Sequence, residues 1–256
     1  QAEQDALELR QRLGLGLAPV IDIVTLLELE MGVRVYVRRL APRISGLFAY
    51  DDKVGACILL NASHPRERRT LTAAHELGHL LSTRREADVV DEHSPERSPE
   101  ERYCHAFARN FLMPARAVMQ KFKEVTAGAG RLTRRHVIVL AHAFGVSREA
   151  LVRRLEELKL TKPGTWDWFQ DNGGITDDQV RQVLGDLVRT DTQSADADHP
   201  TSLRLNMLAA EAARQGLLSE GQLMRLLKLD RLELRRLLDT LEMEGSAADE
   251  APVLPL

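Results

Sequence analysis

Hydrophobic residues in the first part of the chain follow first a helical and then an alternating pattern. Leucines set among charged residues predict a helix at 4–14, and a second helix is expected at about 19–31. Three short apolar stretches then predict strands, at 33–39, 44–50 and 54–61. We expect these strands to form a small antiparallel sheet.

In the rest of the chain, hydrophobic residues mostly follow the spacing of a helix. Long helices are expected at about 65–82 and 99–112, separated by a charged stretch at 84–101 that we interpret as an exposed loop. Residues 131–158 predict two helices joined by a turn at Gly145, which is the shape of a helix-turn-helix unit.

The sequence changes character after residue 160. A Gly-, Pro- and Trp-containing stretch, "KPGTWDWFQDNGG", is expected to be a loop, and 189–202 is polar enough for a linker. The predicted organisation is α+β. It comprises a core at 1–125, a helix-turn-helix-like unit packed on it at 126–160, a loop with a short helix and linker at 161–202, a helical module at 203–245 and a disordered tail at 246–256.

Composition narrows the class of protein. The chain has 256 residues, of which 44% are hydrophobic, and a net charge of −3, so no global field favours nucleic acid. Two cysteines far apart in sequence favour a reducing compartment. No apolar run approaches the roughly 20 residues that span a bilayer, so no membrane partner is expected. The chain does not begin with Met, and its sequence leaves open whether a further domain precedes it.

One stretch of the helix at 65–82, "TLTAAHELGHLL", carries the residues of a metal site. His75 and His79 are four apart and share a helix face, so both imidazoles can bind one ion. Glu76 lies one step around the helix, where it can act as a base without binding the metal. Three protein ligands around Zn²⁺ leave one position for water.

The alternative is a charged surface turn that happens to carry two histidines. Small and apolar residues surround the pair, namely Leu71, Ala74, Gly78 and Leu81. This face is therefore expected to be buried, where two imidazoles beside a carboxylate would be costly without a partner. The context favours the metal.

A third ligand has several candidates, which are Asp91, Glu92, His93, Glu96, Glu100, Glu101, Cys104 and His105. Glu101 extends the buried stripe of the second long helix, so it leads, and Glu100 and His105 follow. Glu101 is also the third residue after Ser98, where it could instead be the acid of a capping box. Both interpretations stay open on the residues alone.

His105 lies one helical turn after Glu101. It could orient Glu101 or a ligand histidine, stabilise an oxyanion, or simply be a core histidine bonded to backbone. His93 is a second candidate for the oxyanion. Cys104 is expected to be a core residue.

Together, "TLTAAHELGHLL" and "ERYCHAFARNFLMP" resemble the ImmA/IrrE family of metallopeptidases, over residues 5 to about 160. The resemblance implies a zincin-like fold in which His75, His79 and Glu101 hold zinc and Glu76 is the base. Mn²⁺ is the alternative ion. The family usually has Asn where this chain has His105, so this position departs from the family's pattern.

The resemblance also implies a substrate. Characterised members of the family are cytoplasmic proteases that cut helix-turn-helix repressors in response to stress or DNA damage, or in the control of mobile elements. We therefore expect a protein substrate of that kind. The alternative is a non-catalytic regulator that contains metal, or an antitoxin-like partner protein, acting through DNA or protein contacts.

Two helical regions offer further contacts. The segment 131–160 is locally basic, so its second helix could touch DNA. Its apolar face favours packing on the core instead, with the arginines in solvent. The module at 203–245 has too many acids for tight phosphate binding and is expected to serve protein contact, sensing or dimerisation. The sequence gives no indication of the oligomeric state.

Overall fold

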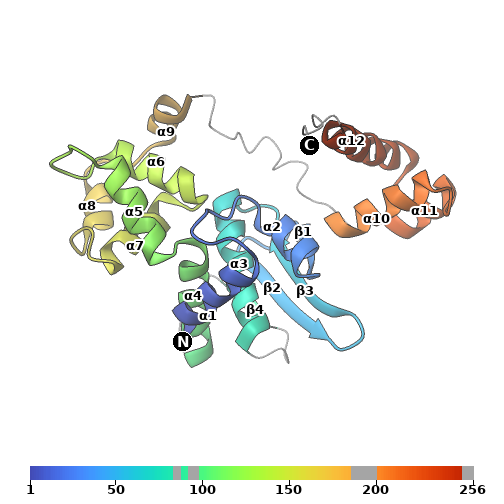
Figure 1. The fold of residues 1–256 in the computed structure, drawn as a ribbon, viewed down its shortest axis with the longest axis horizontal. Helices are drawn as coiled ribbons and strands as arrows, with labels where there is room; N and C mark the ends of the chain where they lie inside the picture. The colour runs from blue at the N-terminus through green and yellow to red at the C-terminus, as the bar shows by residue number, and fades with distance from the viewer. Residues whose placement is uncertain (83–87, 92–97, 186–200, 250–256) are drawn as a thin grey trace, which may run out of the picture.

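The computed structural model describes residues 1–82, 88–91, 98–185 and 201–249 (Figure 1). In chain order the elements are α1 (Ala2–Arg12), α2 (Ile23–Thr25), the π-helix η1 (Leu26–Glu30), β1 (Arg34–Arg38), β2 (Ile44–Asp51), β3 (Gly55–Asn61), α3 (Arg66–Ser82), β4 (Asp88–Asp91), α4 (Pro99–Leu112), α5 (Ala115–Val125), α6 (Arg134–Phe144), α7 (Arg148–Glu157), α8 (Thr165–Asp171), α9 (Asp177–Leu184), α10 (Leu203–Arg214), α11 (Glu220–Leu227) and α12 (Arg231–Asp249). The predicted α+β, zincin-like class is confirmed. No helix among the described residues is long and apolar enough to cross a lipid bilayer.

The sheet is mixed. Its strand order is β1-β3-β2-β4. β2 pairs antiparallel with both β3 and β4, whereas β1 pairs parallel with β3, with Val35 opposite Ile58. The antiparallel prediction is therefore right for the β2–β3 hairpin and wrong for β1. Because β3 lies inside the sheet, neither of its edges is open to another strand.

Asn61 explains how β1 comes to lie beside β3. The link from β1 to β2 passes the end of β3, a distance of roughly 10 Å, or two strand spacings. The buried Asn61 side chain holds this link. Its amide donates to the carbonyl oxygens of Ala41 (3.1 Å) and Ile44 (2.7 Å), and its oxygen accepts from the Leu40 N–H (3.2 Å). Apolar alternation predicts strands but carries no information about such a crossing.

The stretch predicted as a Gly/Pro/Trp loop contains the helix α8. Trp166 and Phe169 are three residues apart, and both side chains pack into the core with 9% and 2% of their surface exposed. Gly164 begins the helix in a left-handed conformation, with φ of 81°. Two aromatic residues at helical spacing outweigh the flanking turn residues, which is why the loop prediction is wrong.

Other boundaries also differ from the prediction. β4 lies within the stretch predicted as a loop, and α5 was not predicted as a separate helix. α12 continues to Asp249, so the first four residues of the predicted tail at 246–256 are helical, and 250–256 lie outside the described residues. The turn at Gly145 is confirmed, with φ of 63°.

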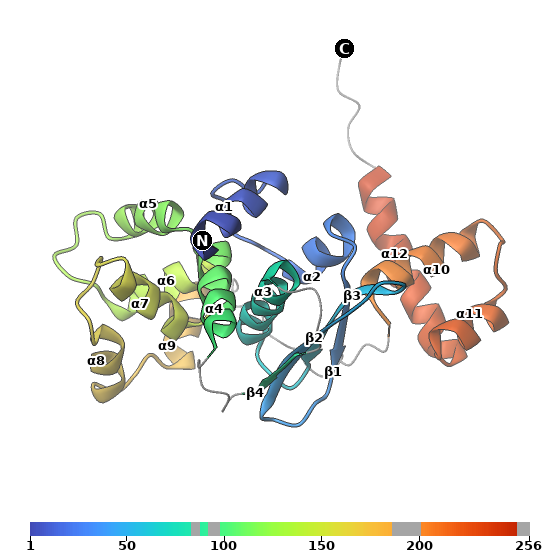
Figure 2. The same ribbon diagram turned by 90° about the horizontal axis from the view of Figure 1, so that it is seen from below.

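Two hydrophobic clusters hold the molecule together. The larger runs from Ala6 to Ile175 and includes α3, α4, α6 and α7. The smaller lies among α10, α11 and α12. In Figure 2, helices α5–α9 lie on one side of α3 and the sheet, and helices α10–α12 lie on the other side. Glu28 joins the two parts, because its buried carboxylate accepts from the Val35 N–H (2.9 Å) and from the Arg204 N–H at the start of α10 (2.7 Å).

Two buried arginines hold the end of α4. Arg10 Nη1 donates to the Phe111 carbonyl (2.5 Å), and Arg154 of α7 donates to the Met113 carbonyl (3.2 Å) and to Asn110 Oδ1 (2.6 Å). The last carbonyls of a helix lack partners within it and carry partial negative charge, so cations at this end are stabilising.

We expect Arg154→Leu to lower the free energy of unfolding by about 2 kcal/mol, because charged hydrogen bonds to buried acceptors are lost. The matched control is Arg153→Leu, which removes an exposed ion pair with Asp167 and should lower the free energy of unfolding much less. Urea denaturation measures both. Equal losses of unfolding free energy in the two variants would show that the buried hydrogen bonds of Arg154 stabilise the protein no more than an exposed ion pair does.

Candidate metal centre

Helix α3 presents His75, Glu76 and His79 to the interior. Their exposed fractions are 3%, 0% and 1%, which agrees with the expectation that this face is buried. α3 packs against β2 and β3 on one side and against α4 on the other (Figures 1 and 2). The helix therefore carries three polar side chains into a region that otherwise excludes water.

Glu101 of α4 meets the two histidines. His79 Nε2 lies 3.2 Å from His75 Nε2 and 3.2 Å from Glu101 Oε1, and His75 Nε2 lies 3.3 Å from Glu101 Oε2. Two ring nitrogens and a carboxylate thus converge from two separate helices. His105 is close as well, because ligand atoms of His75, Glu101 and His105 all lie within 4.8 Å of one another.

The spacing fits a small divalent cation. Ligand bonds of roughly 2.0–2.2 Å at tetrahedral angles place neighbouring ligand atoms about 3.4 Å apart. The separations of 3.2–3.3 Å among His75, His79 and Glu101 are close to this value. Burial, followed by the neighbouring His105 and His79, lowers the pKa of His75 to about 3. Its imidazole is therefore uncharged at neutral pH and has a lone pair to offer.

The close crossing of α3 and α4 depends on Gly78. A Cβ at this position would lie 2.9 Å from Cys104 Cα and 3.1 Å from Cys104 Cβ. Cys104 itself is fully buried, as predicted, and burial raises the pKa of its thiol to about 12, so it packs as a neutral group. The sequence shows the glycine, but only the structure shows the helix backbone against which it lies.

Glu101 serves two purposes through different atoms. Its backbone N–H donates to Ser98 Oγ (2.9 Å), so Ser98 caps α4 as the capping interpretation expects. Its carboxylate faces His75 and His79 instead. The two interpretations of the sequence therefore do not compete, because one concerns the backbone and the other the side chain.

Glu100 contacts the other nitrogen of His79. Its Oε1 lies 3.3 Å from His79 Nδ1 and accepts from Ser82 Oγ at 3.0 Å. A carboxylate in this position orients a metal-binding imidazole and fixes its tautomer. The sequence ranked Glu100 only as a substitute for Glu101 and missed this orienting contact. Of the remaining candidates, Glu92, His93 and Glu96 lie outside the described residues.

Glu76 lies where α3 faces β2. A Cβ at Gly46 of β2 would come within 2.9 Å of Glu76 Oε1 and 3.1 Å of the Leu59 carbonyl oxygen. Gly46 thus leaves the space that the carboxylate occupies. This requirement for a glycine in β2 was also missed by sequence reasoning.

Three arginines of the α6–α7 unit bind other parts of the same chain. Arg134 donates to the Gly174 carbonyl (2.7 Å), Arg148 to Asp177 (2.9 Å) and Arg153 to Asp167 (2.7 Å). These contacts attach α8 and α9 to the unit. The packing interpretation expects internal contacts of this kind.

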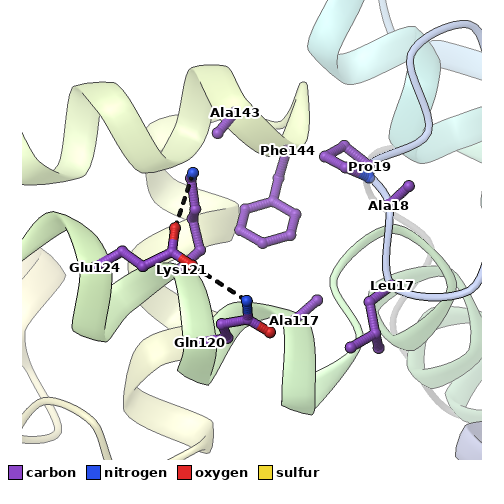
Figure 3. Close-up of a pocket in the computed structure, with 9 residues that line it drawn as sticks. All are labelled: Leu17, Ala18, Pro19, Ala117, Gln120, Lys121, Glu124, Ala143 and Phe144. Atoms are coloured by element: carbon purple, nitrogen blue, oxygen red, sulfur yellow. Dashed lines mark hydrogen bonds and ion pairs between the residues drawn. The ribbon is translucent and has the colours of Figure 1, made fainter.

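Two hollows of the surface lie away from His75 and His79. One of about 270 Å³ is bounded by Phe144, Ala117 and Pro19, with the Lys121–Glu124 ion pair at its side (Figure 3). A larger one of about 850 Å³ lies between the start of α3, the turn after α6, and α9. Neither includes His75, His79 or Glu101.

Comparison with known families decides the class of the protein. The family model for peptidase M78, described as the IrrE N-terminal-like domain, matches residues 29–156, which is half of the chain. The chain belongs to this family. The matched region contains β1 to α7 and with them the whole histidine and glutamate cluster. A comparison with curated proteins found no match. As a member of the M78 family with a His/Glu site suited to a metal, the protein is a metallopeptidase.

Removing the carboxylate of Glu101 tests its role as the third ligand in this M78 site. We expect Glu101→Ala to weaken metal binding by more than about 100-fold, since ligands matter more than the outer contacts that cost 10–100-fold. Ser98→Ala should keep the metal and lose about 1 kcal/mol of stability as a lost helix cap. Elemental analysis after dialysis measures metal per chain. Metal retained in Glu101→Ala would limit Glu101 to the helix start and move the search to Glu100 and His105.

Gly78→Ala tests the helix crossing. The added methyl group must displace backbone of α4, so we expect a loss of about 1–3 kcal/mol in unfolding free energy and weaker metal binding. The control is Gly221→Ala in α11, where a Cβ meets nothing within 4 Å and stability should stay equal or rise. Urea denaturation and chelator competition provide the two readouts. Unchanged metal affinity in Gly78→Ala would show that the metal site does not depend on the close crossing of α3 and α4.

Proposed function

We propose that this M78 metallopeptidase is a zinc-dependent endopeptidase that cleaves a helix-turn-helix transcriptional repressor. The observation that carries the proposal is the convergence of His75, His79 and Glu101 at separations of 3.2–3.3 Å. Two imidazoles and one carboxylate are a typical catalytic donor set for zinc. Mn²⁺ is the alternative ion, but ligands with nitrogen atoms favour zinc.

Each residue of the cluster has a defined part in peptide hydrolysis. His75, His79 and Glu101 hold the ion, and Glu100 orients His79. When bound there, the ion would supply Lewis acidity that activates water and polarises a peptide carbonyl. Glu76 accepts the proton of the attacking water and passes it to the leaving amine. Its burial between α3 and β2 limits the competing access of bulk water.

The sheet offers an edge for an extended substrate. β3 is internal, so the strand at 54–61 has no free edge for an extended substrate. β4 forms the edge on the β2 side, next to the strand that lies over Glu76. Main-chain pairing with this edge would bring a peptide alongside the active-site helix.

The substrate class rests on the family resemblance. The role in a stress, DNA-damage or mobile-element response and the cytoplasmic location rest on it as well. The α6–α7 unit supports a protein partner over DNA, since its arginines bind Asp167, Asp177 and backbone carbonyls. A protein substrate therefore agrees better with this surface than direct binding to phosphates.

Glu76→Gln separates a protease from a non-catalytic regulator. We expect cleavage of purified helix-turn-helix repressors to fall by at least about 10²-fold, as for loss of a general base, with one metal ion per chain retained. Glu67→Gln, on an exposed part of the same helix, is the control and should cleave as the wild type does. Cleavage is followed by gel and mass spectrometry. If the Glu76→Gln variant regulates its target as well as the wild type does, the protein acts by binding alone.

A further inference from the structure

His105 lies beside the cluster but outside the pattern of ligands that the family resemblance implies. It follows Glu101 by one turn of α4, and its Nε2 lies 3.8 Å from Glu101 Oε2. Its ring centre lies 4.4 Å from that of His75. The ligand atoms of His75, Glu101 and His105 fall within 4.8 Å of one another. The ring therefore faces the same space as the two buried histidines.

The two simpler roles of His105 do not agree with its surroundings. A core histidine would be buried and bonded to backbone, but 39% of this side chain is exposed, and no backbone hydrogen bond holds its ring within the described part of the chain. A histidine that orients Glu101 would donate a hydrogen bond to it. A separation of 3.8 Å is too long for one.

The geometry of a fourth ligand is within reach. A tetrahedral site requires about 3.4 Å between ligand atoms, whereas His105 Nε2 lies 3.8 Å from Glu101 Oε2 and the ligand atoms of His105 and His75 lie within 4.8 Å of each other. His75 and His79 are almost fully buried and have little room to turn. The half-exposed ring of His105 has that room, so rotation of its side chain can bring it closer to His75 and Glu101.

We propose that His105 is an exchangeable fourth ligand of the metal in this protein. The inference rests on the metal site of the proposed function and deepens it. Four protein ligands make a closed site, whereas three leave a position for water. Ligation by His105 therefore closes the resting site, and its departure opens that position to water and substrate. The exposed side of the ring gives it a route out of the site without movement of α4.

Co²⁺ is the probe that reports coordination directly, without any need for activity. We compare visible absorption of the Co²⁺-loaded wild type with that of His105→Ala and His105→Asn, before and after addition of thiocyanate. The control is His142→Ala, an exposed histidine of α6. Asn can still donate a hydrogen bond to Glu101, so it would rescue a residue that acts only by positioning Glu101.

The expected result is a wild-type spectrum of a four-coordinate site that thiocyanate leaves unchanged. Both His105 variants should show an altered spectrum that responds to thiocyanate and a Co²⁺ affinity lower by about 10-fold or more, and added imidazole should restore the wild-type bands in His105→Ala. His142→Ala should match the wild type.

Three results would overturn the inference in distinguishable ways. Identical spectra and thiocyanate responses in the wild type and His105→Ala, with Co²⁺ bound in both, would exclude His105 as a ligand and leave the proposed function intact. Rescue by His105→Asn would likewise reduce it to a positioning residue. Failure of the wild type to bind Co²⁺ would contradict the metal site itself, and with it both proposals.

Discussion

The crossing of α3 and α4 at Gly78 and Cys104 sets the geometry on which the rest of the site depends. The two helices approach so closely that a Cβ on Gly78 would lie 2.9 Å from the α4 backbone. Only this approach lets a carboxylate one turn before Cys104 reach histidines on either side of Gly78. The separations of 3.2–3.3 Å between these groups follow from the packing of two backbones, not from long, mobile side chains.

The surrounding elements hold α4 in that position. Ser98 caps its first turn, and Arg10 and Arg154 bind carbonyls of its last turn from α1 and α7. The helix-turn-helix-like unit thus supports the metal centre, because its buried Arg154 side chain binds a carbonyl at the end of α4, the helix that carries Glu101. This role accounts for the unit within a metallopeptidase, and three of its arginines attach α8 and α9.

Much of the fold and of the candidate site could be predicted from the sequence. The bounds of α3 and α4 and the burial of His75 and His79 follow from residue spacing, which local patterns record well. The role of Glu101 stayed open because Ser98 and Glu101 have the spacing of a helix cap, and a pattern cannot show that backbone and side chain act separately. The parallel β1–β3 pair and helix α8 were missed, since they depend on Asn61 and on a core that Trp166 and Phe169 enter from far along the chain.

In the proposed site, one metal ion lies between α3 and α4, held by His75, His79 and Glu101. Anomalous diffraction from crystals of the zinc-loaded protein, recorded on both sides of the zinc absorption edge, tests it most directly. We expect a single strong peak per chain within bonding distance of the two Nε2 atoms and the Glu101 carboxylate. A peak elsewhere, or no peak while Glu101 turns back toward Ser98, would contradict it.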